Sequence, residues 1–219
     1  GSAALAGALA LIEAARPLAA QALEAAVGDL EYGEGRFRIA GTDRGIGLAE
    51  LAGKQPGQRI VCEHTETAKG QTWPNGCQVA EVEVDPETGA VRVARHSAVD
   101  DIGRVINPLT AESQVHGGVA QGLGQALFEQ SVYDETGQLL TGSFMDYAMP
   151  RAADMPDLQT HFDQSVPTQQ NLLGAKGAGE AGCHGAVPAI VNAVIDALGV
   201  KEIDMPLTPE KVWRALQDG

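Results

Sequence analysis

A glycine-rich run between residues 174 and 185 contains a single carboxylate, Glu180, which is the strongest candidate for a catalytic base in this sequence. Backbone amides in such a run can point at an anion or a polar ligand. An apolar helix follows the run, so we expect Glu180 to be partly desolvated, which would raise its pKa and suit a general base. Because a G-x-G pattern alone is weak evidence, a phosphate-type loop with an incidental exposed glutamate is the alternative.

A second candidate surface lies on the helix that the sequence predicts after Asn107. Four residues are spaced to share one face of this helix: Gln114, Gly118, Gln121 and Gln125. Their amides could hydrogen-bond a flat polar cofactor. Glycine inside a helix costs about 1 kcal/mol relative to alanine, so close approach of another backbone or of a ligand must compensate. The alternative is a solvated polar face combined with a glycine-mediated contact between helices.

The histidines and cysteines do not have the spacing of a metal site. No H-E-x-x-H or C-x-x-C occurs, so we expect no metal ligands and a structural role for most of the five histidines. His184 is the exception, because it lies four residues after Glu180. A cofactor-independent hydrolase that uses Glu180 and His184 would need a closed pocket in this chain. An odd number of cysteines suits a reducing compartment, so we expect a cytoplasmic protein.

Composition limits the class of protein and its partners. The 219 residues are 44% hydrophobic but only 4% aromatic, so aliphatic side chains must fill the core. The formal net charge of −14 argues against nucleic acid and anionic membrane surfaces as partners. The first apolar stretch is mostly alanine and lacks a basic region before it, so we expect neither a signal peptide nor a membrane span.

The first part of the chain, residues 1–57, is predicted to be a helical segment with a small hairpin. Its expected elements are a helix over residues 3–28, a hairpin over 30–39 and a helical turn over 47–52. Pro17 should kink the helix or divide it near Arg16, because proline lacks the backbone donor.

Residues 58–219 are predicted to form an α+β domain of long helices packed on a small, mainly antiparallel sheet. The expected strands are 59–62, 78–84, 91–96 and 158–162. Asn107 should cap a helix with Pro108 at its first position, ending near Gln130. A buried helix should begin at Pro188, because it is apolar almost all round, and a last helix should begin at Thr208.

Six segments, in this order along the chain, resemble the xanthine dehydrogenase / aldehyde oxidase / carbon monoxide dehydrogenase large-subunit family. They are AEVEVDPETG (80–89), DDIGRVINP (100–108), QVHGGVAQGLG (114–124), MDYAMP (145–150), KGAGEAG (176–182) and PLTPEKVW (206–213). Several long motifs in series are more specific than any one glycine pattern. The chain is similar to the C-terminal part of the molybdopterin-binding subunit of that family.

This resemblance implies a molybdenum-cofactor-binding domain and a reaction. The family hydroxylates an aldehyde or an N-heterocycle, or oxidises carbon monoxide, with water as the oxygen source. The position of Glu180 matches the base that acts on the Mo–OH group before hydride passes to a Mo=S ligand. By the same match, the cofactor-binding residues are Gln114, Gly117, Gly118, Lys176, Gly177, Ala178 and Gly179.

The resemblance also implies partners and a cofactor form. In the full enzyme we expect the cytosine dinucleotide form of the molybdopterin cofactor, with iron–sulfur and FAD centres on other subunits or domains. A full large subunit is several times longer, so we expect this chain alone to bind no cofactor and to be inactive. Cys183 and His184 depart from the family pattern. The resemblance does not identify the substrate. The alternative is a stand-alone, non-catalytic binding or assembly domain with the same fold.

Overall fold

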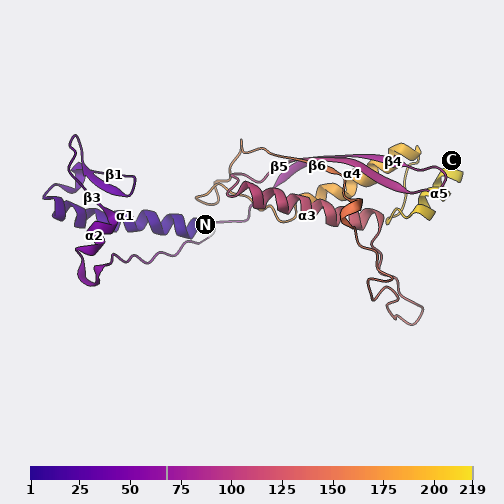
Figure 1. Cartoon of the computed structure of the whole chain (residues 1–219), viewed down its shortest axis with the longest axis horizontal. Coiled ribbons are helices and arrows are strands. Elements are labelled where there is room, and N and C mark those ends of the chain that lie inside the picture. Colours follow the sequence, from indigo (N-terminus) through magenta and orange to yellow (C-terminus); the bar gives the residue numbers. More distant parts are fainter. Residues whose placement is uncertain (68, 219) are drawn as a thin grey trace. The chain divides into compact units, whose positions relative to one another are not determined.

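The computed structural model describes residues 1–67 and 69–218, and these residues form two compact units (Figure 1). The first unit is Gly1–Gln71 with Gln169–Leu173, and the second is Thr72–Thr168 with Gly174–Gly219. The division after Gln71 replaces the boundary that we predicted after residue 57. The segment after residue 57 stays with the first unit because Ile60 packs against that unit's core. The strand predicted at 59–62 is wrong, since these residues have no strand partner.

The first unit is a helix packed on a small antiparallel sheet. Its elements are α1 (Ser2–Leu23), the 3-10 turn Val27–Asp29, β1 (Leu30–Gly33), β2 (Arg36–Ile39), β3 (Gly45–Gly47), α2 (Leu48–Gly53) and the 3-10 turn Pro56–Gln58. The predicted hairpin and helical turn are confirmed. Helix α1 is a single helix that contains Pro17, so the division into two helices is wrong. It ends before residue 28 because Glu24 adopts a left-handed conformation, with φ of 51°.

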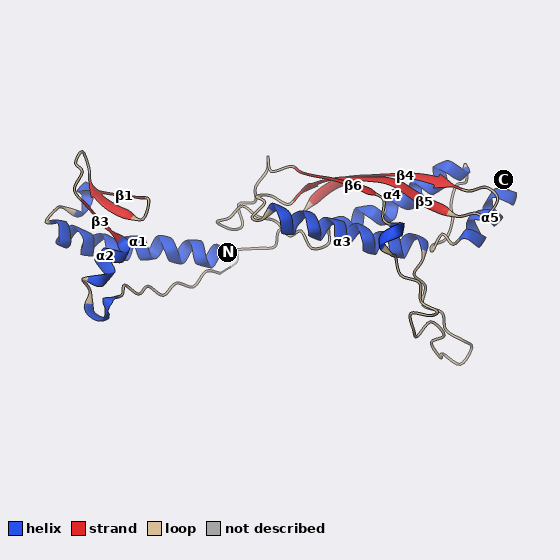
Figure 2. Ribbon diagram, viewed as in Figure 1, coloured by secondary structure: helices blue, strands red, loops and turns tan. Residues whose placement is uncertain are grey.

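The second unit is a three-stranded sheet with long helices. Its elements are β4 (Asn75–Val84), β5 (Val91–Asp101), α3 (Pro108–Leu127), the 3-10 turn Ala152–Asp154, β6 (Asp157–Phe162), α4 (Ala181–Leu198) and α5 (Pro209–Asp218). Strand β5 is central, antiparallel to β4 and parallel to β6. Figure 2 shows α3 and α4 side by side along the sheet. The α+β class is confirmed, with one parallel strand pair in the sheet.

Local sequence signals account for several of these elements. The Asn107 side chain accepts a hydrogen bond from the Thr110 amide at 3.2 Å, so the predicted cap of α3 is confirmed. Strand β4 alternates as expected, with Ala80, Val82 and Val84 turned toward the core. Because side chains alternate along a strand, the apolar residues of β4 face the core and the polar residues between them face away from it.

Helix α4 differs from its prediction in two ways. It begins at Ala181, so Pro188 lies inside the helix rather than at its start. Its buried residues, which include Ala186, Ile190 and Val194, follow one stripe, although the helix is apolar almost all round. The prediction of a fully buried helix is therefore wrong for this chain, because α3 and β4 cover only part of its surface.

Helices α1 and α4 are long and apolar enough, by length and composition alone, to cross a membrane. The core helix of a soluble protein passes the same test, so this observation is weak evidence for a span. The absence of a membrane span stays a prediction.

Candidate functional site

All the residues of the candidate site lie in the second unit, where a loop over residues 176–180 leads into α4. The loop is fixed at its start to the end of β5. The Lys176 amide donates to the Ile102 carbonyl at 2.8 Å, and the Lys176 ammonium pairs with Asp101 Oδ2 at 2.5 Å. Both side chains of this ion pair are largely buried, and the other oxygen of Asp101 accepts from the Gly103 amide. The ion pair therefore anchors the loop from inside the unit.

The other end of the loop is fixed to α3. The side-chain amide of Gln114 donates to the Gly179 carbonyl at 3.0 Å. Glu180 follows as the residue that precedes α4, and its backbone carbonyl accepts from the His184 amide at 3.1 Å. The structure thus brings together Gln114 and the glycine-rich loop, which the resemblance assigns to the same cofactor.

The side chain of Glu180 is exposed, and no described residue hydrogen-bonds it or pairs with it. The prediction that this chain partly buries Glu180 is wrong. Gly179 before it has no side chain, Ala181 after it has only a methyl group, and α4 begins only after Glu180, so none of them covers the carboxylate. Any desolvation of Glu180 must come from groups outside this chain.

Glycines allow the start of α4 to lie directly on α3. A Cβ at Gly182 would lie 2.2 Å from the Val115 carbonyl oxygen, and one at Gly118 would lie 2.8 Å from the Cys183 amide nitrogen. Gly122 also approaches α4, where a Cβ would meet Ala186. The glycine-mediated helix contact, which we kept as an alternative, accounts for Gly118 and Gly122.

The exposed surface beside the loop differs slightly from the predicted face of α3. Gln114, Gln121 and Gln125 are exposed as expected, but Gly118 is buried under α4 and cannot form an open part of that face. Gly117 is exposed, and a Cβ there would meet nothing within 4 Å. The polar face therefore consists of glutamine amides and one open glycine.

The loop itself leaves room for a polar group that approaches from outside. A Cβ at Gly179 would meet nothing within 4 Å, and one at Gly177 would meet only a carbonyl oxygen at 3.6 Å. The carbonyl oxygen of the Gln114 side chain has no partner among the described residues. Open backbone and an unused amide acceptor fit one side of a pterin-type cofactor, while the Lys176 ammonium is already paired.

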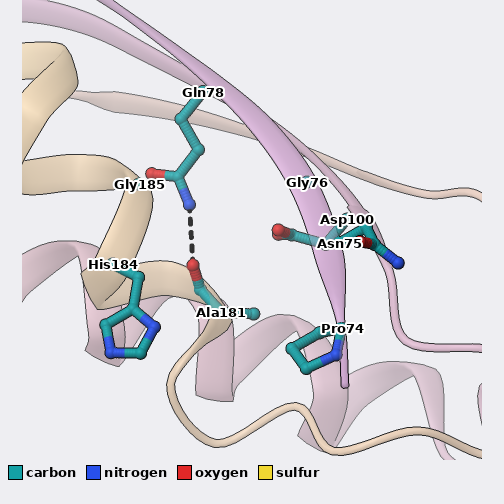
Figure 3. A pocket seen from close by; sticks show the side chains of 8 residues that line it. All are labelled: Pro74, Asn75, Gly76, Gln78, Asp100, Ala181, His184 and Gly185. Carbon is teal, nitrogen blue, oxygen red and sulfur yellow. Dashed lines mark hydrogen bonds between the residues drawn. The ribbon is translucent and has the colours of Figure 1, made fainter. Parts of the chain in front are cut away.

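A cavity of about 270 Å³ lies beside the first turn of α4 (Figure 3). Its lining residues are Pro74, Asn75, Gly76, Gln78, Asp100, Ala181, His184 and Gly185. In Figure 3, Asp100 and His184 lie on opposite sides of the cavity. Glu180 is not a lining residue, so the cavity does not provide the closed pocket for a hydrolase that uses Glu180 and His184.

Asp100 was not a candidate at the level of sequence. Its side chain is 2% exposed, and its Oδ2 atom has no hydrogen-bond partner. Burial raises the pKa of this carboxyl above its ordinary value. Nothing in the Asp100-Asp101 pair indicated that the second aspartate would pair with Lys176 and the first would stay unpaired.

Among the residues that the structure describes, no cluster of three or more histidine, cysteine or acidic side chains could hold a metal ion. The three cysteines are free thiols. Any metal at this site would be held by a cofactor or by groups outside the described residues.

The comparisons with known proteins define the family. Residues 1–156 match the model of the molybdopterin cofactor-binding domain, and the chain belongs to this family. The resemblance to large subunits of the xanthine dehydrogenase, aldehyde oxidase and carbon monoxide dehydrogenase group is thereby confirmed.

Individual relatives show the same relationship. The chain is 39% identical to the 6-hydroxypseudooxynicotine dehydrogenase complex subunit gamma of Paenarthrobacter nicotinovorans, over 99% of this chain and 29% of the relative. It is 36% identical to the carbon monoxide dehydrogenase large chain of Hydrogenophaga pseudoflava, over 93% of this chain and 27% of the relative. The structure of a Cu,Mo-CO dehydrogenase in its carbon monoxide-reduced state matches with a TM-score of 0.90 and 33% identity, over 100% of this chain and 29% of that chain. The chain thus spans less than a third of the length of these relatives.

Proposed function

We propose that this chain is the C-terminal part of a molybdenum hydroxylase large subunit in which Glu180 is the catalytic base. The complete enzyme would oxidatively hydroxylate an aldehyde or an N-heterocycle, or oxidise carbon monoxide, with water as the oxygen source. The observation that carries this proposal is the loop over residues 176–180. It is fixed at both ends, to Asp101 and to Gln114. Its last residue, Glu180, has an exposed carboxylate with no partner among the described residues.

Glu180 has the chemistry that the reaction needs. Hydroxylation replaces a substrate hydrogen by a hydroxyl group whose oxygen comes from water, and it releases two electrons and two protons. When bound, the molybdenum cofactor supplies the activated oxygen and takes up the electrons. Glu180 accepts the proton of the attacking oxygen, and it is free to do so because its carboxylate has no partner among the described residues.

Residues around the loop would hold the cofactor. Gln114 offers an amide oxygen, and Gly117 and the backbone of residues 177–179 offer surfaces that no side chain covers. Lys176 would act through its backbone and by fixing the loop, because its ammonium is paired with Asp101. We further propose the cytosine dinucleotide form of the cofactor, iron–sulfur and FAD partners that carry the electrons away, and a cytoplasmic location.

The test is to produce this chain within its complete large subunit, together with the partner subunits. We expect the assembled enzyme to contain molybdenum and releasable cytidine nucleotide. It should reduce an artificial electron-accepting dye with at least one substrate among aldehydes, N-heterocycles and carbon monoxide. An assembly that binds the cofactor but reduces no dye with any of these classes would favour the non-catalytic binding domain instead.

A further inference from the structure

A chain of partly buried hydrogen bonds connects β5, β4 and the start of α4. His96 Nε2 and Gln78 Oε1 are 2.9 Å apart. The Gln78 amide nitrogen donates to the Ala181 carbonyl at 2.9 Å and approaches the Gly182 carbonyl at 3.3 Å. Gln78 therefore joins the central strand of the sheet to the residue that directly follows Glu180.

The Ala181 carbonyl decides which way the Gln78 amide points, and His96 holds the other end of that amide. The ring of His96 is 1% exposed, and its Nδ1 atom is buried without a partner. Burial lowers the pKa of this imidazole, which favours the neutral ring with a single N–H group. Since the oxygen of Gln78 can only accept, that N–H group belongs on Nε2. A flipped amide would set its oxygen against the Ala181 carbonyl oxygen, so the amide nitrogen of Gln78 faces Ala181 and its oxygen faces His96.

Gly185 makes room for this contact. A Cβ at Gly185 would lie 2.5 Å from Cδ of Gln78, so a side chain there would displace the amide from the helix. On the other side of the same turn, Gly182 lies against the Val115 carbonyl oxygen of α3. The first turn of α4 is thus held between β4 and α3 without a side chain of its own at either contact.

The two backbone carbonyls that flank Glu180 are each held by a glutamine. Gly179 is held by Gln114 on α3, and Ala181 is held by Gln78 on β4. We propose that Gln78, whose amide oxygen is held by His96, is a positioning residue that sets the direction of the Glu180 carboxylate. This inference rests on the proposed role of Glu180 as the base.

The first test measures the rate at which substrate reduces the complete, molybdenum-loaded enzyme in a single turnover. Gln78→Met keeps the length of the side chain but removes its hydrogen bonds to His96, Ala181 and Gly182. We expect it to slow reduction about 10- to 100-fold at unchanged molybdenum content, the size of effect that misplacing a catalytic group produces. Gln159→Met on β6 is the matched control, because the Gln159 side chain is exposed and makes no hydrogen bond to a described residue, and this variant should stay within about twofold of the wild type.

A double variant separates positioning from general disturbance. In the Glu180→Gln background, Gln78→Met should have almost no further effect, because there is no base left to position. The same fold loss in both backgrounds, or no loss in either, would overturn the inference while leaving the role of Glu180 intact. A fully active Glu180→Gln enzyme would instead overturn the proposed function.

The second test needs no catalysis and uses the 219-residue chain itself. Backbone amide hydrogen exchange at residues 184–186, in the first turns of α4, should be about tenfold faster in Gln78→Met than in the wild type or in Gln159→Met, as expected from the loss of one hydrogen bond. If Gln78→Met does not fold, Gln78→Glu replaces it, because a carboxylate still accepts from His96 but cannot donate to Ala181. Unchanged exchange in a folded variant would contradict a positioning role for Gln78.

Discussion

Two adjacent aspartates at the end of β5 have opposite environments, although they share a residue type and a strand. Asp101 pairs with Lys176 and so anchors the loop that ends in Glu180. Asp100 lies beside the cavity with one oxygen buried and unpaired. Side chains alternate along a strand, so Asp101 faces the loop and Asp100 faces the cavity. Only Asp101 is therefore stabilised by the ion pair with Lys176.

The unpaired Asp100 should make stability depend on pH. Burial raises its pKa, so the folded chain binds this proton more tightly than the unfolded chain does. The stability that this group contributes is present below the ordinary carboxyl pKa of about 4 and is lost as the pH rises through the raised folded value. Asp100→Asn removes this titration. The free energy of unfolding can be measured with urea for the wild type and the variant. As the pH rises from about 4 to 7, the free energy of the variant should increase relative to that of the wild type. A difference that stays constant over this range would contradict the account.

At the scale of the elements, the contact between α3 and α4 explains Gly118, Gly122 and Gly182, but not every glycine in the two helices. Gly118 and Gly182 let the two backbones approach, and Gly185 receives the amide of Gln78. Gly117, next to Gly118, takes part in none of these contacts. The close approach of the two helices therefore requires glycine at position 118 but not at position 117, and substitutions can test this difference.

Replacing each of these neighbours by alanine should have opposite effects on stability. Gly118→Ala places a methyl group against the backbone of α4, and overpacking of this kind costs about 1–3 kcal/mol. Gly117→Ala points into open space and should stabilise the helix by up to about 1 kcal/mol. Urea denaturation of the two variants measures both effects. Equal effects of the same sign would show that the close approach of α3 and α4 is not maintained in solution.

The elements that the sequence predicted well are those with local signals. The cap at Asn107, the β4–β5 hairpin and the start of the last helix depend on neighbouring residues and formed as expected. The start of α4 was predicted at Pro188, because proline at the first position of a helix is a strong local signal. Packing against α3 and β4 supports two earlier helical turns that contain glycine, and no local pattern could show this.

The candidate site was likewise predicted only in part. The resemblance assigns Gln114 and the glycine-rich loop to one cofactor, and the structure shows that they contact each other. Gln78 was missed because it is one polar residue in an alternating strand, and its contact is with a helix more than a hundred residues further along the chain. The burial expected for Glu180 rested on the apolar helix that follows it, but α4 begins only after Glu180 and leaves its side chain exposed.

At the scale of the whole molecule, several apolar side chains are uncovered. Phe144 and Met145 are 83% and 93% exposed, and Met149 is half exposed, in the segment that follows α3. Grouped apolar side chains of this size mark surfaces that other protein covers. Since the chain spans less than a third of its relatives, we expect the rest of the large subunit to cover this segment.

Methionine oxidation can test that expectation. Hydrogen peroxide should oxidise Met145 severalfold more slowly in the complete large subunit than in this chain, because covered thioethers react slowly. Mass spectrometry of the peptide that contains Met145 and Met149 measures both rates. Equal rates in the two forms would show that the segment stays exposed after assembly.

The central claim is that Glu180 is the base of a molybdenum hydroxylase, and one measurement tests it most directly. The complete, molybdenum-loaded enzyme is reduced by its substrate in a single turnover, with wild type, Glu180→Gln and the control Glu87→Gln compared. Glu87 is an exposed glutamate in the β4–β5 turn. We predict that Glu180→Gln lowers the reduction rate about 100- to 10,000-fold, the range for loss of a general base, at unchanged molybdenum content. Glu87→Gln should match the wild type, and a Glu180→Gln enzyme that does the same would contradict the account.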